Sequence, residues 1–363
     1  MTGGALTVGV EEEFLLVRPD GRLGRFGPEV VKASHDRQGV LQVELNRCQV
    51  ESATGVCTSG CELLVQLRHL RTELAARAAS RGLRLLPSGT ALLAENKPAG
   101  ITPRPRYQRM ATLFGAIANA NPNCGCHVHV SIPDRATGVE ISNRLRPWLP
   151  VLLALTANSP YADGRDTGYS SWRYVRWSRW PSAGPPPLFA SVQHYESSVE
   201  ALLRTGAMMD RGMVYWDIRL SDRQQTLEFR VSDVAATAEE AALLGIIVRG
   251  LVVGALRDID RGRAVPPLPM EVLRAFLWRA ARDGLGGHCP TPPTGELVPG
   301  HAIPVLLADH LRPVLESEDF DFVLAGLRAL GRSGGGAQRQ RAVHARAHRL
   351  TDVIDELVLP SPS

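Results

Sequence analysis

Three adjacent glutamates interrupt an apolar run near the start of the chain, in the stretch TVGVEEEFLLV at residues 7–17. Successive side chains of a β-strand point to opposite faces, so Glu11 and Glu13 would share one face about 7 Å apart. Two carboxylates held that close repel each other, and they stay ionised cheaply only if a cation lies near them. A solvated acidic face on an exposed edge strand would explain the same pattern, so this strand alone does not decide between the two interpretations.

Two further carboxylates and two histidines occur at strand-like spacing elsewhere in the chain. The stretch LQVELNRCQVES, residues 41–52, and the stretch CGCHVHVSI, residues 124–132, alternate apolar positions with Gln, Glu or His. Residues 216–222 and 226–233, WDIRLSD and TLEFRVSD, alternate in the same way around a short polar turn and therefore predict an antiparallel hairpin.

The polar faces of these predicted strands carry Glu, His and Arg in place of the mixed polar residues of an ordinary solvated face. Oxygen-rich clusters with an occasional His suit Mg²⁺ or Mn²⁺. The candidate ligands are Glu11, Glu13, Glu44, Glu51, His127 and Glu228. Arg219 and Arg230 fall on the same face and could bind phosphate or carboxylate groups through two hydrogen bonds each. Metal ions and arginines together indicate a bound nucleoside triphosphate.

Several other site types do not fit the sequence. There is no G-x-x-x-x-G-K-[ST] motif and no G-x-G-x-x-G unit between a strand and a helix, so P-loop and dinucleotide-binding folds are excluded. The residues Cys124, Cys126, His127 and His129 are all zinc-ligand types, but strand alternation places the cysteines on the face opposite the histidines. The two cysteines are expected to be small core residues, and His129 is expected to orient a ligand, bind substrate or form a polar wall.

The loop GRDTGYSSWR, residues 164–173, offers a candidate substrate clamp. Arg165 and Arg173 could hold a substrate carboxylate, and Tyr169 with Ser170 could add hydrogen bonds. A surface loop with arginine–aromatic stacking is the alternative interpretation. The following YVRWSRW, residues 174–180, resembles a nucleic-acid stacking surface, but the run is short and has no matching basic stripe, so no nucleic-acid partner is predicted.

Helices must support this sheet. Residues 59–81, 141–157 and 238–258 predict helices, the first and last with capping-box patterns at their starts. Pro- and Gly-rich segments at 181–187, 284–300 and 331–336 predict loops, and a basic helical stretch is expected over 339–358. The predicted fold class is α+β: an antiparallel sheet forms an open cleft, and helices pack on its outer face.

Length and composition set the remaining expectations. The chain has 363 residues and a formal net charge of +4, and its only lysines are Lys32 and Lys97. We expect one catalytic domain over residues 1–363, with a helical C-terminal part from about 260. No apolar run reaches the roughly 20 residues of a membrane helix, and no signal-peptide pattern is present. Six cysteines in a chain this long do not predict a disulfide scaffold, so a reduced, cytoplasmic protein is expected.

Five ordered stretches resemble the glutamate–cysteine ligase type 2 family, the bacterial carboxylate–amine ligases. They are TVGVEEEFLLV, QVESATGVC, CGCHVHV, PVLLALTANSPYADGRDTGYSSWR and WDIRLSDRQQTLEFRVSDV. The match covers roughly the first two thirds of the chain and continues more weakly beyond. The family is similar in fold to glutamine synthetase, and this agrees with the sheet predicted from alternation alone.

The resemblance implies an ATP-dependent ligase that forms an amide through an acyl phosphate, from small-molecule carboxylate and amine substrates and with Mg²⁺ or Mn²⁺. It implies that the six candidate ligands hold the metal ions, that Arg230, Glu51 and Glu228 act in catalysis, and that Arg219 and Arg230 bind ATP. It also implies a homodimer. One stretch, SGTALLAENKP, departs from the family pattern, with Ala91 where histidine is expected. This change predicts a lost polar contact near the cleft and an altered donor or acceptor substrate.

Two other functions use the same residues and remain open at this stage. A metal-dependent hydrolase of amides or phosphoesters would need the carboxylate cluster but no ATP. A binding protein without activity is the other, although the full set of acidic positions argues against it.

Overall fold

The computed structural model describes residues 6–31, 35–36 and 39–360. Their main feature is an antiparallel sheet with the strand order β2-β3-β4-β1-β6-β10-β9, and β5 pairs with β1 beside this path. The strands are β1 (Val8–Val17), β2 (His35–Asp36), β3 (Gly39–Val43), β4 (Gln49–Thr54), β5 (Arg84–Leu86), β6 (Gly125–Ser131), β9 (Ile218–Leu220) and β10 (Thr226–Asp233). The predicted hairpin at 216–233 is confirmed as β9–β10, with a first strand of only three residues.

The register around β1 fixes which side chains can meet. Glu11 pairs with His127 of β6 on one side, and Glu13 pairs with Glu51 of β4 on the other. The pairing of β10 with β6 shifts between Phe229 and Ser232, because β10 contains one more residue than β6 over this span. Such a β-bulge bends a strand and redirects its side chains. The side chains nevertheless keep alternating through Val231, which packs in the same core cluster as Phe229, while Arg230 lines the cavity with Glu228.

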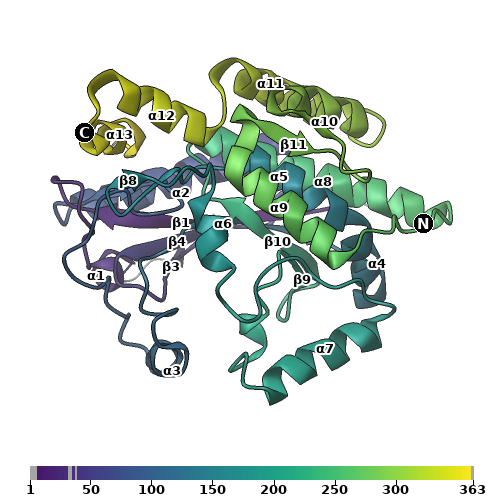
Figure 1. Ribbon diagram of the computed structural model, residues 1–363, viewed down its shortest axis with the longest axis horizontal. Helices are drawn as coiled ribbons and strands as arrows, with labels where there is room; N and C mark the ends of the chain where they lie inside the picture. Colours follow the sequence, from purple (N-terminus) through teal and green to yellow (C-terminus); the bar gives the residue numbers. More distant parts are fainter. Residues whose placement is uncertain (1–5, 32–34, 37–38, 361–363) are drawn as a thin grey trace.

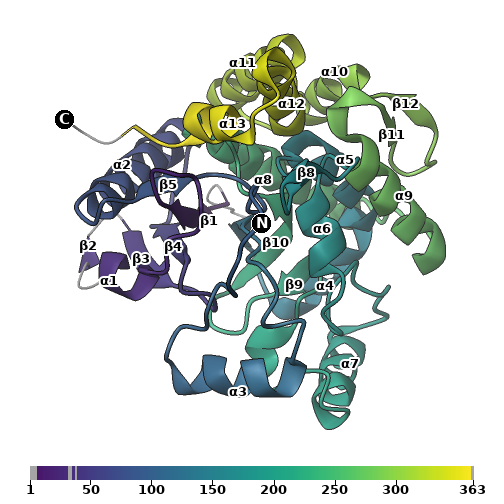
Figure 2. The same cartoon turned by 60° about the vertical axis from the view of Figure 1, so that its left-hand side comes forward.

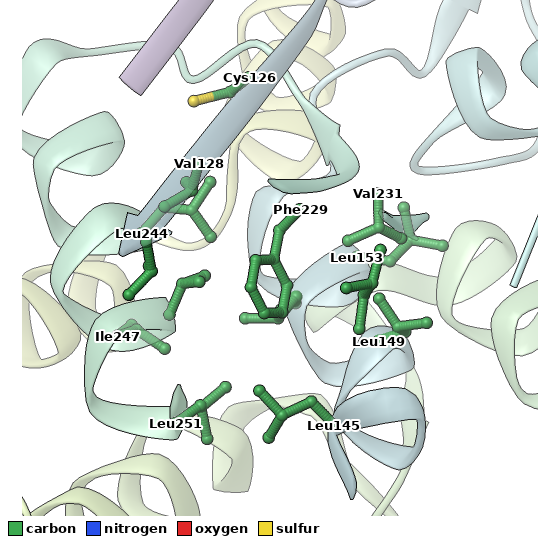
Figure 3. Packing of buried hydrophobic residues seen from close by; sticks show 14 of the residues in the cluster. Cys126, Val128, Leu145, Leu149, Leu153, Phe229, Val231, Leu244, Ile247 and Leu251 are labelled. Atoms are coloured by element: carbon green, nitrogen blue, oxygen red, sulfur yellow. The ribbon is translucent and has the colours of Figure 1, made fainter. Parts of the chain in front are cut away.

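Helices cover the apolar face of the sheet. They are α2 (Gly60–Ala79), α4 (Arg135–Leu145), α5 (Leu149–Thr156) and α8 (Ala238–Asp260), and Figure 1 shows α8 and α5 on the opposite side of the sheet from α3 (Pro105–Phe114) and α7 (Val192–Arg204). Figure 3 shows Phe229 and Val128 of the sheet beside Leu244 and Ile247 of α8. Cys126 belongs to this core and Cys124 to a second core cluster, which confirms that they are buried apolar residues.

The helix starts follow the predicted capping chemistry. Ser59 Oγ accepts a hydrogen bond from Glu62 N at 3.2 Å, and Thr237 Oγ1 accepts one from Glu240 N at 3.2 Å. The helix predicted over 141–157 is instead α4 and α5, separated by a 3₁₀ turn (Arg146–Trp148). Pro147 and Pro150 explain the division, since proline lacks the N–H that a helix interior needs and fits a first turn.

The C-terminal part is helical with one small hairpin. It contains α9 (Met270–Asp283), α10 (Ile303–Leu311), α11 (Ser317–Ser333), α12 (Gly336–Ala347) and α13 (Leu350–Leu357), with β11 (His288–Pro290) paired to β12 (Leu297–Pro299). The segment 284–300, predicted to be a loop, therefore contains a hairpin, and the start of 331–336 is the last turn of α11. The basic stretch is two helices, because His348 between them adopts a left-handed backbone with φ 56°.

The remaining elements lie at the edges of this framework. They are α1 (Gly27–Val31), α6 (Trp172–Trp177), and a two-stranded hairpin of β7 (Tyr161–Ala162) with β8 (Arg165–Asp166). Figure 2 shows α3 and α7 together at the bottom of the molecule, away from α11 and α12. Among the described residues, no helix combines the length and the apolar character needed to cross a membrane.

Candidate active site

A cavity of about 960 Å³ lies on the polar face of the sheet. All six predicted metal ligands line it, together with three further residues predicted to act in the site: Glu11, Glu13, Glu44, Glu51, His127, Glu228, His129, Arg219 and Arg230. They come from β1, β4, β6, β9, β10 and the residue that follows β3. Strand alternation therefore brought these nine side chains to one wall from segments more than 200 residues apart in sequence.

Three of these residues lie close enough together that they could hold a metal ion. One ligand atom each from Glu11, His129 and Glu228 can be chosen so that all lie within 4.8 Å of one another. His129 Nε2 is 3.3 Å from Glu11 Oε1 and 3.9 Å from Glu228 Oε2, while its Nδ1 is 3.0 Å from Thr226 Oγ1. His129 Nε2 is buried, and although burial opposes it, the neighbouring carboxylates of Glu11 and Glu228 raise the pKa of His129. An oxygen-rich set with one imidazole fits Mg²⁺ or Mn²⁺.

His127 extends the same group toward Glu13. Its Nδ1 lies 3.3 Å from Glu11 Oε2, and its Nε2 lies 4.0 Å from Glu13 Oε1. Burial and the neighbouring Arg230 guanidinium lower the pKa of His127 to about 4, so the ring is neutral at neutral pH and can act as a ligand. The prediction for His127 therefore remains compatible with the geometry, and His129, predicted only as a substrate contact or polar wall, is an additional candidate ligand.

The carboxylates nearest β4 repel each other. Burial and the charge of Glu44 raise the pKa of Glu13 to about 7. Burial, the charge of Glu11 and a hydrogen bond to Glu44 raise the pKa of Glu51 well above its ordinary value. A cation among these groups would remove that repulsion, as expected for a second part of the metal site.

Two arginines contact the carboxylate of Glu228. Arg219 donates from Nε to Glu228 Oε2 at 2.6 Å and from Nη2 to Oε1 at 3.0 Å, and Arg230 Nη1 donates to Oε1. Although burial opposes it, these two guanidinium groups hold the pKa of Glu228 below its ordinary value. The Arg230 guanidinium lies against the rings of Trp177 and Tyr215, 5.9 and 5.8 Å from their centroids. The site thus combines carboxylates, imidazoles and positioned guanidinium groups on one wall.

The predicted substrate clamp does not reach this cavity. Arg165 is exposed on β8, and the hydroxyl of Tyr169 accepts a hydrogen bond from Trp278 Nε1 of α9 at 3.2 Å. Arg173 is only 1% exposed, and its guanidinium donates to the carbonyl oxygens of Val231 and Arg230. The sequence placed all three in one motif, but α6 turns the Arg173 side chain into the protein interior.

The departure at Ala91 also lies away from the cavity lining. Ala91 is 4% exposed and packs in the second core cluster with Leu92 and Tyr161. The predicted loss of a polar contact at the cleft is therefore not found at this position. The expectation of an altered substrate is not tested by this position and remains a prediction.

Sequence analysis missed an aromatic wall of the cavity. Trp177, Trp180 and Tyr215 line it, with Trp177 and Tyr215 ring centroids 4.7 Å apart, and Phe114 of α3 packs 5.2 Å from Trp180. The repeated Trp residues of YVRWSRW were the available signal, but they do not reveal which side of α6 faces the cavity. Helix α3 was also missed, because its ten residues span fewer than three helical turns and give few repeats of the pattern.

Solved structures with the same architecture are ligases. The chain aligns with a glutamate–cysteine ligase of Francisella tularensis, solved in complex with AMP, with a TM-score of 0.71 at 13% identity over 97% of this chain and 88% of that one. It aligns with a bifunctional glutathione synthetase of Pasteurella multocida with a TM-score of 0.69 at 17% identity, over 97% of this chain and 51% of that one. The fold is thus that of the glutamine synthetase-like ligases, as predicted.

Similarity in sequence identifies the family. Residues 7–358 match glutamate–cysteine ligase family 2, and the chain belongs to that family. A relative from Rhodococcus jostii, named "Putative glutamate--cysteine ligase 2-1", is 54% identical over 98% of this chain and 96% of its own length. A relative of the same name from Nocardia farcinica is 46% identical over 97% of this chain and 92% of its own length. The chain is accordingly an ATP-dependent ligase by family.

Proposed function

We propose that the protein joins a carboxylate to an amine at the expense of ATP, through an acyl phosphate, and that at least one substrate is an amino acid, as in glutamate–cysteine ligation. The observation that carries this proposal is the convergence of Glu11, His129 and Glu228 within 4.8 Å in a cavity that Arg219 and Arg230 also line. Phosphoryl transfer needs positioning and charge stabilisation more than covalent help from the protein.

The chemistry has two balanced steps. A substrate carboxylate oxygen attacks the γ-phosphorus of ATP, and the bond from phosphorus to the ADP oxygen breaks. The amine nitrogen then attacks the acyl carbon, an amide bond forms, and phosphate leaves while the amine gives up a proton. Bound Mg²⁺ or Mn²⁺ would neutralise the negative charges of the triphosphate and the incoming carboxylate.

The protein's own residues supply the positions for these steps. Glu11, Glu13, Glu44, Glu51, His127, His129 and Glu228 are the groups we propose to hold the ions. The guanidinium of Arg230 is fixed by Glu228 and by two aromatic rings, so it can stabilise the transferring phosphoryl group with little reorganisation. Arg219 is fixed by Glu228 and by the carbonyl oxygens of Gly212 and Val214, and we propose that it contacts the triphosphate.

An assay of ADP release tests the proposal. The protein is incubated with ATP, Mg²⁺ or Mn²⁺, and pairs drawn from a panel of amino acids and amines, and products are identified by mass spectrometry. We expect ADP release that depends on both substrates and a product with the mass of an amide. Turnover of an amide or phosphoester without ATP would instead indicate a hydrolase and would overturn the proposal.

Two further expectations belong to this proposal. All six cysteines are free thiols in the structure, five of them buried, and we propose a reducing, cytoplasmic location. A homodimer and a single catalytic domain remain predictions, which light scattering and limited proteolysis of the full chain would test.

A further inference from the structure

A group of carboxamide side chains lies at one end of the cavity. Gln49 pairs with Leu15 of β1, two residues beyond the Glu13–Glu51 pair, whereas His129 pairs with Gly9 near the other end. The two β1 partners, Gly9 and Leu15, are six positions apart, which corresponds to about 20 Å along the strand. Asn46 and Asn123 line the cavity with Gln49, and we call these three residues the amide end.

Gln49 connects the other two members. Its backbone N–H donates to the carbonyl oxygen of Asn46 at 3.0 Å. Its side-chain Nε2 donates to the carbonyl oxygen of Asn123 at 2.8 Å. Two hydrogen bonds from one buried glutamine therefore hold the backbone carbonyl groups of both asparagines in place.

The side chains of the two asparagines have unused hydrogen-bonding atoms. Asn46 is only 4% exposed, and its Nδ2 is buried without a partner among the described residues. The Oδ1 atom of Asn123 is also buried and, over the same part of the chain, has none. Buried polar atoms are nearly always hydrogen-bonded to protein or to a bound molecule. A donor and an acceptor that both lack partners, in residues that line one end of a cavity, therefore indicate a ligand group that offers both.

The surrounding charges select the kind of ligand. The amide end lies beside Glu13 and Glu51 and itself offers a ligand three uncharged amides and no guanidinium group. The arginines Arg219 and Arg230 pair with Glu228, whose backbone is opposite His129 on the sheet. The triphosphate therefore fits the region of the arginines, and the amide end is left for the substrate that is not ATP.

We propose that Asn46 and Asn123 bind the head group of an α-amino acid substrate, with Asn46 Nδ2 donating to its carboxylate and Asn123 Oδ1 accepting from its ammonium group. This inference rests on the proposed ligase function and assigns the amino-acid subsite within it. An α-amino acid carries an acceptor, its carboxylate, and a donor, its ammonium group, on the same carbon. An uncharged pair of amides can meet both without leaving a net charge buried.

Steady-state kinetics of Asn46→Ala and Asn123→Ala test the assignment. The amino acid that supports the fastest ADP release is varied at saturating ATP, and ATP is then varied at saturating amino acid. Loss of a hydrogen bond to a charged group should raise the KM for the amino acid about ten- to hundredfold, and the KM for ATP should change less than about twofold. Gln193→Ala, an exposed carboxamide on α7 that does not line the cavity, is the control and should keep both constants.

Three results would overturn the assignment. The first is an unchanged KM for every amino acid, which would mean that water satisfies the two asparagines. The second is an increase confined to ATP. The third is an equal increase for both substrates. Thermal melting shows whether each variant folds. If Asn46→Ala does not fold, Asn46→Asp replaces it, because aspartate keeps the shape of the side chain and removes the donor. A wild-type protein that releases no ADP with any amino acid would overturn the proposed function as well, whereas an active wild type with unaffected variants would overturn only this inference.

Discussion

The two faces of β1 use the same residue in opposite ways. Glu12 points away from the cavity and is completely buried, and Arg71 of α2 donates to both of its oxygens at 2.9 and 2.5 Å. Arg71 also donates to the carbonyl oxygen of Ala235 at 2.8 Å. Glu11 and Glu13, one residue to either side, face the cavity beside histidines and other carboxylates.

The difference lies in the balance of charge. On the helix-covered face one carboxylate meets one guanidinium, and the pair joins α2 to the sheet. On the cavity face the sheet brings together five glutamates and only two strand arginines, and both of these arginines are bound to Glu228. The other arginines that line the cavity come from segments outside the strands. Paired buried charges hold elements together, while an excess of buried carboxylates raises pKa values and creates affinity for a cation. The three adjacent glutamates thus divide between structure and the proposed chemistry.

The largest expected effect is on the cavity face. Glu228→Gln and Glu51→Gln each remove a proposed ligand while keeping side-chain shape. Metal ions supply several kcal/mol of charge stabilisation, so turnover should fall by about 10³-fold or more. ADP release measures the loss, and circular dichroism checks that the fold survives. Wild-type rates in both variants would count heavily against the metal assignment.

A substitution on the helix-covered face of β1 should lower the stability of the protein. Glu12→Gln leaves Arg71 as a buried charge without its partner, and the free energy of unfolding should fall by about 3 kcal/mol. Chemical denaturation measures this change. Glu239→Gln removes a carboxylate from the exposed pair with Arg68 and should cost less than about 1 kcal/mol. Equal losses in the two variants would show that burial does not distinguish the pairs.

The sequence predicted the cavity face well for a physical reason. A strand repeats every two residues, so spacing alone placed Glu11 with Glu13 and His127 with His129. Capping residues likewise predicted the starts of α2 and α8. These inferences need only local geometry, and the structure confirms them.

What the sequence could not predict depends on contacts between distant segments. Nothing local identifies Arg71 as the partner of Glu12, or places the β10 bulge beside Arg230. The direction of Arg173 depends on how α6 packs, and so an interior arginine was interpreted as a substrate clamp. The aromatic wall and α3 were missed because short segments carry weak periodicity.

A smaller effect is expected in the pH dependence of stability, which also distinguishes the two faces of β1. The pKa of Glu13 in the folded state is about 7, above its ordinary value of 4.5. Between these values the folded state binds more protons than the unfolded state, so this group's contribution to stability falls as pH rises through that window. Metal ions bind the ionised form, and Mg²⁺ should therefore raise the melting temperature more at about pH 8 than at about pH 6.

Glu13→Gln provides the control for this experiment. The variant should lose part of the pH dependence of the metal-free melting temperature, because the amide does not ionise. Calorimetric scans measure the melting temperature at each pH without Mg²⁺, and scans with Mg²⁺ measure how much the ion raises it. An identical dependence in variant and wild type would show that Glu13 does not titrate in this range.

The smallest effect is expected outside both faces. Arg165→Ala removes an exposed side chain that does not line the cavity, and the KM of each substrate should change less than about twofold. Steady-state kinetics with both substrates measure this. A tenfold rise in one KM would instead restore Arg165 as a substrate contact.

Binding of Mn²⁺, followed by electron paramagnetic resonance, tests the division between adjacent glutamates most directly. Wild type and Glu12→Gln should bind the ion with similar affinity, while Glu11→Gln should bind it at least about tenfold more weakly. Undiminished binding by Glu11→Gln, or an equal loss in Glu12→Gln, would contradict the proposal that the cavity face holds the metal.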